Sequence, residues 1–370
     1  MLFHLIILLP ALVCLFWFAY YMADNLFSRA TEPNGQTAAK RVITVFYLAT
    51  TVLYSCHCAY FAGAGAPVWE TIYATVNLCV YPLFYIFLTR LTYSDLGVGK
   101  RVIISNILFF LPALIILVSY TACFLTEAER VRDIFKVFGR LCFAVQAVCV
   151  WVVGSRMIQT YRRRLDDYYS DDRSFALFPI NVLLHLFGAI AVFSIILNMI
   201  GREWFAGKLL VVVPSVLMSL SLYALGYVVS QFNIPASAIL SDDSEQNKEP
   251  VRHSLRERFE EIMQEKKPYL SANLTIQDLA TMLGTNRTYL SEMFRTEYGM
   301  SFSTYINNQR IENAKHILSD PQYETHKEAI IMAQIESGFA SDSTFYHLFK
   351  KFAGKSPLAY RQEQLSSLKI

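Results

Sequence analysis

The sequence predicts an all-α protein: a seven-helix transmembrane bundle, followed by a soluble α-helical domain with two helix-turn-helix units joined by a long helix. Three observations support this prediction. Seven long apolar stretches occupy residues 2–230, a polar segment without cysteine follows from about residue 251, and that segment twice repeats a helix, a glycine turn and a helix. The chain is 54% hydrophobic and only 17% charged, whereas soluble domains more usually carry about 25% charged residues.

Each apolar stretch is long enough to cross a bilayer, since about 20 apolar residues span a hydrocarbon core of about 30 Å. The stretches are Leu2 to Met22, Val42 to Ala62, Trp69 to Leu88, Val102 to Leu125, Ile134 to Gly154, Phe175 to Ile200 and Leu209 to Ser230. The fifth carries Lys136 and Arg140 in its first two turns, where long basic side chains can reach the interface. No basic residue precedes the first stretch, and no small-residue cleavage motif is obvious. We therefore expect it to be a retained helix and not a secretory signal.

Basic residues in the connections predict the orientation, because Lys and Arg near membrane ends favour the cytoplasmic side. The connections after the first, third and fifth helices hold 11 of them: Arg29, Lys40, Arg41, Arg90, Lys100, Arg101, Arg156, Arg162, Arg163, Arg164 and Arg173. The other connections hold four: Arg130, Arg132, Arg202 and Lys208. With seven helices, this distribution predicts an outer N-terminus and a cytoplasmic C-terminal domain.

Polar residues inside the predicted bundle are candidates for a ligand pocket or a gating element, because each is costly in a membrane unless it faces the bundle interior. They are His57, Asn77, Gln146, Asn181, His185 and Asn198. Hydrogen bonding between helices would explain them equally well. The Cys56-His57-Cys58 triplet does not predict a metal site, because consecutive side chains on a helix point about 100° apart. All seven cysteines lie in predicted membrane helices, so we expect no disulfide framework and no cofactor.

The part after the bundle divides into three segments. Residues 231–250 are polar, have no apolar period and end in Pro250, which predicts a cytoplasmic linker. Residues 251–268 predict an amphipathic connecting helix, which could join the linker to the following domain or pair with a partner chain. Residues 269–365 form the predicted helix-turn-helix domain. Over residues 251–370 the chain carries 15 Lys and Arg against 14 Asp and Glu, so any contact with DNA would depend on local charge and not on a global field.

The first helix-turn-helix unit begins near Thr275, turns at Gly284, and continues in a helix from Arg287 to about Glu297 that Asn286 can cap. The second helix of such a unit fits the major groove of DNA. Its apolar residues, Leu290, Met293 and Phe294, fall on one face and should be core. Its opposite face, with Thr288, Ser291, Glu292 and Arg295, should meet DNA.

A long helix from about Phe302 to Leu318 predicts a brace between the two units, and the pattern then repeats. We expect a helix over residues 327–336 and a turn at Gly338-Phe339. The second reading helix is expected over residues 343–352, capped by Ser341 or Asp342. Phe345, Leu348 and Phe349 should point inward. The outward residues are Asp342, Ser343, Tyr346, His347 and Lys350. The run Lys350, Lys351, Lys355 and Arg361, together with Arg287 and Arg295, is suited to phosphate contacts.

Residues of about 270 to 363 resemble the AraC/XylS family of bacterial transcription regulators. The resemblance rests on Leu279-Ala280, on residues 289–294 (YLSEMF), 299–302 (GMSF) and 310–314 (RIENA), on Gly338-Phe339, Phe345 and residues 349–351 (FKK), and on residues 354–361 (GKSPLAYR). It implies that the two reading helices enter successive major-groove segments, with Thr288, Ser291 and Glu292 in the first and Asp342, Ser343, Tyr346 and His347 in the second as base-facing residues. The family usually has an apolar residue and then Ala five and four positions before the Gly-Phe pair. Here Ala333 and Gln334 stand there, and we expect Gln334 at the edge of the second unit.

Glu292 and Asp342 are acidic residues on reading faces. Either could accept a hydrogen bond from cytosine N4 or be a solvated or capping residue, and for Asp342 we favour the cap.

These inferences predict a regulator and no enzyme, located in the bacterial inner membrane, in which the bundle senses an unknown extracellular or membrane-borne signal. The expected partners are double-stranded DNA and membrane lipids, with RNA polymerase and a second copy of the chain as further candidates. A transporter or membrane enzyme fused to its regulator is an alternative, although the predicted helices are nearly free of Asp and Glu. A passive anchor released by proteolysis is another. A helical module that binds protein instead of DNA is the alternative for the soluble domain.

Overall fold

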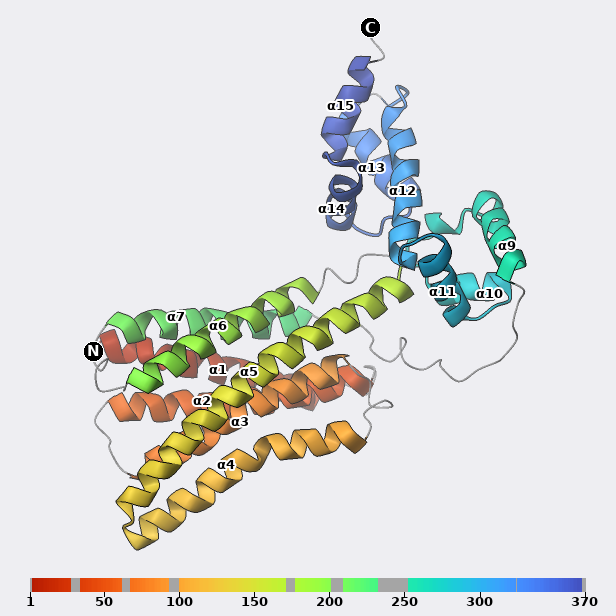
Figure 1. The fold of residues 1–370 in the computed structure, drawn as a ribbon. Coiled ribbons are helices and arrows are strands. Elements are labelled where there is room, and N and C mark those ends of the chain that lie inside the picture. Colours follow the sequence, from red (N-terminus) through yellow and green to blue (C-terminus); the bar gives the residue numbers. More distant parts are fainter. Residues whose placement is uncertain are drawn as a thin grey trace. The chain divides into compact units, whose positions relative to one another are not determined.

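The structure is a computed structural model, and it describes residues 2–27, 34–61, 67–92, 100–170, 177–200, 209–231, 252–323 and 325–367 (Figure 1). These residues confirm the all-α prediction: they form helices, and the β pairing among them is an isolated antiparallel bridge between Tyr169 and Thr275. The chain divides into two compact units. The first comprises Met1–Tyr161 and Ala176–Asp242, and the second comprises Arg162–Phe175 and Asp243–Ile370.

The first unit contains all seven predicted apolar segments as helices. They are α1 (Leu2–Phe27), α2 (Asn34–Phe61), α3 (Pro67–Thr92), α4 (Lys100–Thr126), the first part of α5 (Glu129–Tyr168), α6 (Phe178–Ile200) and α7 (Leu209–Gln231). Among the described residues, six helices are long and apolar enough to cross a membrane, and α6 contributes a shorter apolar stretch, Phe178–Phe193. Of the predicted linker, residues 231–250, only Gln231 is described, as the last residue of α7. Residues 232–250 and the basic residues Arg29, Arg173, Arg202 and Lys208 lie outside the described ranges.

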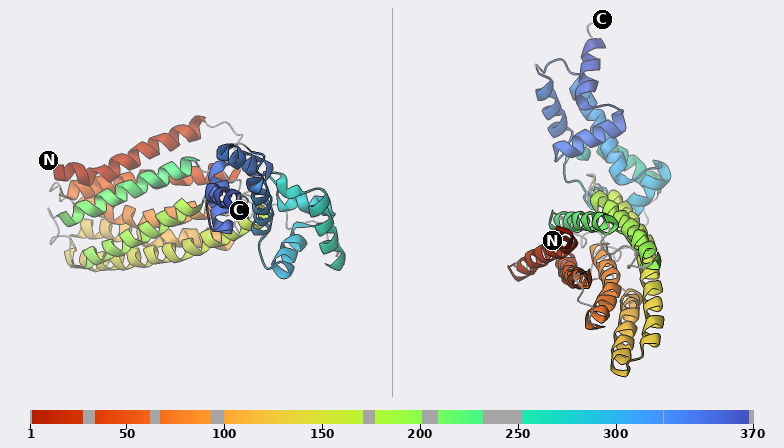
Figure 2. Two further views of the ribbon diagram at one scale, coloured as in Figure 1. Left: turned by 90° about the horizontal axis from the view of Figure 1, so that it is seen from above. Right: turned by 90° about the vertical axis from the view of Figure 1, so that its left-hand side faces the viewer.

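The helices of the first unit lie side by side (Figures 1 and 2). Helix α1 packs between α2 and α7, and α3 packs between α2 and α4. Tyrosine hydroxyls join α1 and α2 to α7: Tyr21 of α1 donates to the Gly226 carbonyl at 2.6 Å, and Tyr47 of α2 donates to the Leu222 carbonyl at 2.7 Å. Helix α5 contacts α6, where Gly188 leaves room for the Trp151 ring; a Cβ at Gly188 would lie 2.9 Å from that ring.

Helix α5 is much longer than the sequence analysis predicted. The apolar segment Ile134 to Gly154 lies within a 40-residue helix, Glu129–Tyr168. At about 1.5 Å per residue this helix is about 60 Å long, about twice the thickness of a hydrocarbon core. Hydropathy detects only its apolar middle, because the last turns carry Arg162, Arg163 and Arg164. Near its start, Lys136 pairs with Glu70 of α3 at 3.0 Å and with Asp133 at 3.3 Å.

The second unit holds the end of α5 and the C-terminal helices. These are α9 (Arg252–Glu265), the 3₁₀ turn η4 (Pro268–Leu270), α10 (Ile276–Leu283), α11 (Arg287–Glu297), α12 (Phe302–Ser319), α13 (His326–Glu336), α14 (Asp342–Ala353) and α15 (Pro357–Ser367). Two apolar cores lie along the predicted brace α12. Its first half contributes Phe302 and Ile306 to the core around α9, α10 and α11. Its second half contributes Ile311, Ala314 and Leu318 to the core around α13 and α14.

Side-chain caps begin helices α10 to α14, and the predicted cap Asn286 is confirmed. Thr275 and Asp278 form a reciprocal capping box at α10, and Asn286 accepts a hydrogen bond from the Tyr289 amide at the start of α11. At α14 the cap is Ser341, which accepts from the Thr344 amide. Our preference for Asp342 as the cap is therefore wrong, because Asp342 is already the first residue of the helix.

Helix α9 closes the first core. Phe259 is fully buried, and Leu255 and Met263 are buried beside it. At the edge of this contact the Glu260 carboxylate accepts hydrogen bonds from Arg256 Nε at 2.8 Å and from the Tyr298 hydroxyl at 3.2 Å. These hydrogen bonds, that of Arg256 first, hold the pKa of Glu260 below its usual value. The amphipathic segment thus packs against the end of α11.

At Gly338 the turn of the second helix-turn-helix unit packs closely against the segment before α10. Its φ is +78°, and a Cβ there would lie 2.5 Å from the Leu270 carbonyl oxygen. We expect Gly338→Ala to cost about 1 to 2 kcal/mol for the left-handed backbone and about 1 to 3 kcal/mol more for the clash. The free energy of local opening, measured by hydrogen exchange of α13 and α14 in the intact protein, should fall accordingly.

Gly354→Ala is the matched control, because Gly354 has φ +75° and no atom within 4 Å of the added Cβ. It should show the backbone cost alone. Equal effects of the two substitutions would contradict the close contact at Gly338.

Candidate nucleic-acid interface

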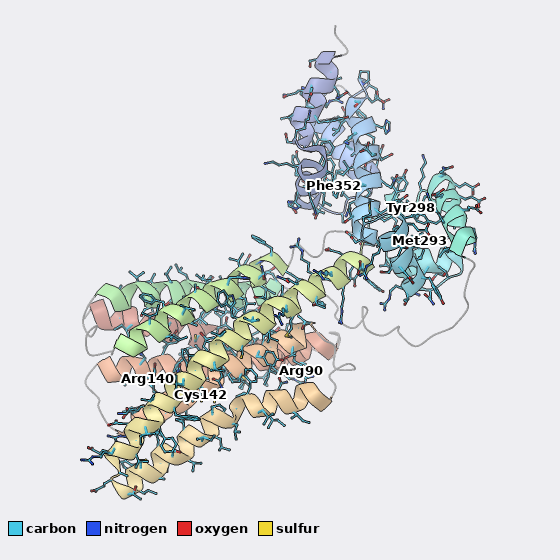
Figure 3. All side chains as sticks on the ribbon, in the orientation of Figure 1. Arg90, Arg140, Cys142, Met293, Tyr298 and Phe352 are labelled. Carbon is cyan, nitrogen blue, oxygen red and sulfur yellow. The ribbon has the colours of Figure 1, made fainter. Side chains whose placement is uncertain are left out.

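The first candidate reading helix is α11. Gly284, with φ +61°, ends α10 and turns the chain, and Asn286, the cap of α11, follows two residues later. Leu290, Met293 and Phe294 are buried, as predicted, and Figure 3 labels Met293 on α11. Thr288 and Glu292 are exposed, and Ser291 and Arg287 are half-buried. The predicted face of α11 is therefore on the surface of its unit, but part of it is covered.

The second candidate reading helix is α14. Phe345, Leu348 and Phe349 point into the second core, as predicted. The predicted base-facing residues are all exposed: Asp342, Ser343, Tyr346 and His347. Lys350 and Lys351 follow in the last turn and are exposed as well. Helix α14 thus presents an exposed face with two exposed lysines in its last turn.

Lys355 lies beyond α14 and is held more closely. Its ammonium pairs with Glu363 of α15 and lies 6.0 Å from the centre of the Tyr360 ring. Lys351, by comparison, lies over the Phe352 ring at 5.5 Å. Lys355 could still reach a phosphate, but it would have to share its charge with Glu363.

Arg361 is not placed for a phosphate contact. Its side chain is 1% exposed. One terminal nitrogen, Nη1, donates to the carbonyls of Leu318 and Asp320 at 3.0 Å each, and Nη2 donates to the Tyr323 carbonyl at 2.7 Å. Arg361 therefore fastens the segment between α12 and α13, and we correct its assignment from a DNA contact to a structural one.

Arg310 has the corresponding position in the first helix-turn-helix unit. No role was predicted for it from the sequence. It is 1% exposed, and it donates from Nε to the Tyr269 carbonyl at 2.7 Å and from Nη2 to the Ser271 carbonyl at 2.6 Å. Each helix-turn-helix unit therefore has a buried arginine, from the helix that follows it, bound to the segment that precedes it. Arg310 belongs to residues 310–314, one of the segments on which the family resemblance rests. The sequence alone does not show that this arginine is buried.

The end of α5 also lies against α11. Asp167 forms an ion pair with Arg295, and the Arg287 guanidinium lies 5.8 Å from the centre of the Tyr168 ring. Both arginines are predicted phosphate contacts. Sequence reasoning placed residues 162–170 in a connection of the membrane bundle, because no local pattern indicates packing against a helix more than a hundred residues later.

The structure describes contacts of three of the predicted intramembrane residues. Gln146 is buried in α5 and donates to the Phe109 carbonyl of α4 at 2.8 Å, which is a bond between helices. His185 Nδ1 lies 2.7 Å from the Asn181 carbonyl of its own helix. His57 lies against the rings of Tyr54 and Tyr73, Asn77 is half-buried, and the Asn198 side chain lies outside the described part. A ligand-binding or gating role for them stays a prediction.

Comparison with known proteins identifies the C-terminal part. A family model described as "Helix-turn-helix domain" matches residues 279–363. Residues 279–363 form a helix-turn-helix domain of the AraC type. The match begins inside α10 and ends in α15, so this helix-turn-helix domain includes both candidate reading helices and the brace between them.

Relatives match over the same region. The "Melibiose operon regulatory protein" of Escherichia coli (strain K12) is 33% identical over 89 residues, which are 24% of this chain and 28% of that protein. The "Msm operon regulatory protein" of Streptococcus mutans is 30% identical over 94 residues, which are 25% and 31%. An "Uncharacterized HTH-type transcriptional regulator" of Staphylococcus aureus is 29% identical over 92 residues, which are 25% and 12%. The chain thus spans less than a third of the length of these relatives.

Lys350 and His347 should differ in what they contribute to DNA binding. We expect Lys350→Ala to weaken binding to all sequences alike and to reduce the slope of log affinity against log salt by about 1, because it removes a phosphate contact. His347→Ala should change the preference at one base pair by about 1 to 3 kcal/mol. Affinities for a set of single-base variants of one duplex, at several salt concentrations, measure both effects. Uniform losses from both substitutions would remove the assignment of His347 as a base reader.

Arg361 should affect stability and not the salt dependence. Arg361→Met leaves three carbonyls without their donor, and each unsatisfied buried group costs about 1 to 3 kcal/mol. Hydrogen exchange should show faster opening of α13 and α15, whereas the salt slope of DNA binding by the folded protein should stay at the wild-type value. A reduced slope with unchanged exchange would return Arg361 to the phosphate contacts.

Proposed function

We propose that this protein is a membrane-bound, sequence-specific transcription regulator, in which the helices of the first unit sense a signal and control the helix-turn-helix domain. The observation that carries the proposal is the joint presence, in one chain, of an AraC-type helix-turn-helix domain and six helices long and apolar enough to span a membrane. The regulatory names of the relatives support transcription control as the output.

The surface of the first unit supports its insertion into a membrane. Large apolar side chains are exposed along α4 and α5, among them Leu125 (77% exposed), Ile134 (68%) and Ile107 (66%). Soluble monomers rarely expose large contiguous apolar patches, whereas lipid tails solvate such side chains. The greater number of Lys and Arg in the odd connections supports a cytoplasmic C-terminus and an outer N-terminus in a bacterial inner membrane.

The helix-turn-helix domain would bind double-stranded DNA through α11 and α14. Thr288, Ser291 and Glu292 in α11, and Asp342, Ser343, Tyr346 and His347 in α14, are the proposed base-facing residues. Phosphate contacts would come from Arg287, Arg295, Lys350, Lys351 and Lys355. The brace α12 would hold the two reading helices in a fixed relation, because it contributes apolar residues to both cores.

Sensing by the first unit is testable by replacement. A chimera in which an unrelated anchor of the same topology replaces residues 1–240 should keep promoter binding but lose the difference in reporter output with and without the signal. An anchor chimera that responds like the intact protein would contradict sensing by the first unit. Expression of the intact protein under varied growth conditions, with a reporter on a promoter it occupies, supplies the reference response.

A further inference from the structure

The face of α11 that the proposed function assigns to DNA is defined by helical spacing. Arg287, Ser291 and Arg295 are four residues apart, so they form one stripe along the helix. Thr288 and Glu292 lie beside this stripe. The stripe contains two of the proposed phosphate contacts and one of the proposed base contacts of the first reading helix.

The end of α5 lies along this same stripe, within the second unit. The Asp167 carboxylate pairs with Arg295 at one end, and the Tyr168 ring lies against the Arg287 guanidinium at the other. Tyr168 also packs against the apolar core of the first helix-turn-helix unit. A carboxylate is an acceptor of the same kind as a phosphate oxygen, so Asp167 occupies Arg295 much as a DNA backbone would.

The chain just after Tyr168 is firmly attached. Tyr169 is 6% exposed and Ser170 is fully buried. Tyr169 forms the antiparallel bridge with Thr275, and the Ser170 amide donates to the Leu274 carbonyl at 3.1 Å. The buried Arg310 donates from Nη2 to the Ser170 hydroxyl at 3.0 Å. The segment is therefore held on the helix-turn-helix domain by backbone, side-chain and core contacts, and not only by a surface ion pair.

We propose that residues 162–170, the last turns of α5 and the two residues after it, are an inhibitory segment that covers part of the DNA-facing side of α11, so that docking of this segment and full DNA binding exclude each other. The inference rests on the proposed function and identifies the segment that controls DNA binding. Helix α14 remains exposed while the segment is docked, so the docked protein keeps one reading helix and binds DNA weakly. Release of the segment frees the Arg287 and Arg295 guanidiniums. Because the same helix begins in the first unit at Glu129, the segment that must move is continuous with the proposed sensor.

Asp167→Asn tests the charge that pairs with Arg295. In the full-length protein in lipid nanodiscs, we expect it to tighten binding to a duplex selected from a random pool by about two- to five-fold, the range of a partly exposed ion pair. Glu265→Gln is the matched control: it removes one negative charge from an exposed side chain at the end of α9, and the described residues show no ion pair to Glu265. Equal tightening by both variants would mean a general charge effect and would overturn the specific contact.

A reversible cross-link tests exclusion directly. Residues in an antiparallel bridge have Cα atoms about 4.5 to 5.5 Å apart, which a disulfide can span. The full-length Asp167→Asn protein with Tyr169→Cys and Thr275→Cys should bind DNA about ten-fold or more weakly when oxidised than when reduced. The two single-cysteine variants should show no such redox dependence.

The outcomes distinguish a failure of the inhibitory segment from a failure of the proposed function. If the reduced protein binds DNA and the oxidised protein binds equally well, the inhibitory segment is refuted and the proposed function stands. Tighter binding by the oxidised form would make Arg162 to Arg164 part of the DNA surface and would also refute inhibition. A reduced protein that binds no DNA would refute the proposed function, and the inhibitory segment with it.

Discussion

The second unit depends on the guanidinium of Arg310, which lies where four parts of the chain meet. It donates to Tyr269 and Ser271 before α10, and to Ser170 at the end of α5. It also lies 5.8 Å from the centre of the Phe339 ring, in the turn of the second helix-turn-helix unit. A buried charge is costly unless hydrogen bonds replace its hydration. The backbone carbonyls around Arg310 supply them, so the positions of these segments are mutually dependent.

The two helix-turn-helix units use this device in the same way. Arg361 of α15 binds the chain before α13, as Arg310 of α12 binds the chain before α10. In the first helix-turn-helix unit the arginine also donates a hydrogen bond to Ser170, which lies outside the helix-turn-helix domain. That difference explains why α11 is partly covered while α14 is open, although both helices have the same pattern of buried residues.

Local patterns in the sequence predicted much of the fold. Apolar stretches of about 20 residues located α1 to α7, and the spacing of Leu290, Met293 and Phe294 located the buried face of α11. Asn286 was predicted as a cap because capping depends on neighbours three residues away. Gln334 is half-buried beside the fully buried Ala333, which agrees with its expected place at the edge of the second core.

Features that depend on distant residues were missed. Arg361 was assigned to phosphate because it follows three lysines, yet its partners lie about forty residues earlier in the chain. The length of α5 was underestimated because hydropathy stops at the charged turns after Gly154. The docking of Asp167 on Arg295 joins residues 128 positions apart, and no periodicity encodes it. Among the predicted DNA-facing residues, exposure was therefore predicted correctly along α14 and only in part along α11.

The central claim is that the intact, membrane-held protein binds DNA. The most direct measurement is genome-wide occupancy of a protein tagged at both ends, with immunoprecipitation through each tag in parallel. The account predicts that both tags recover the same promoter sites. Sites recovered through the C-terminal tag alone would contradict it in favour of a fragment released by proteolysis. The absence of sites with either tag would contradict DNA binding itself.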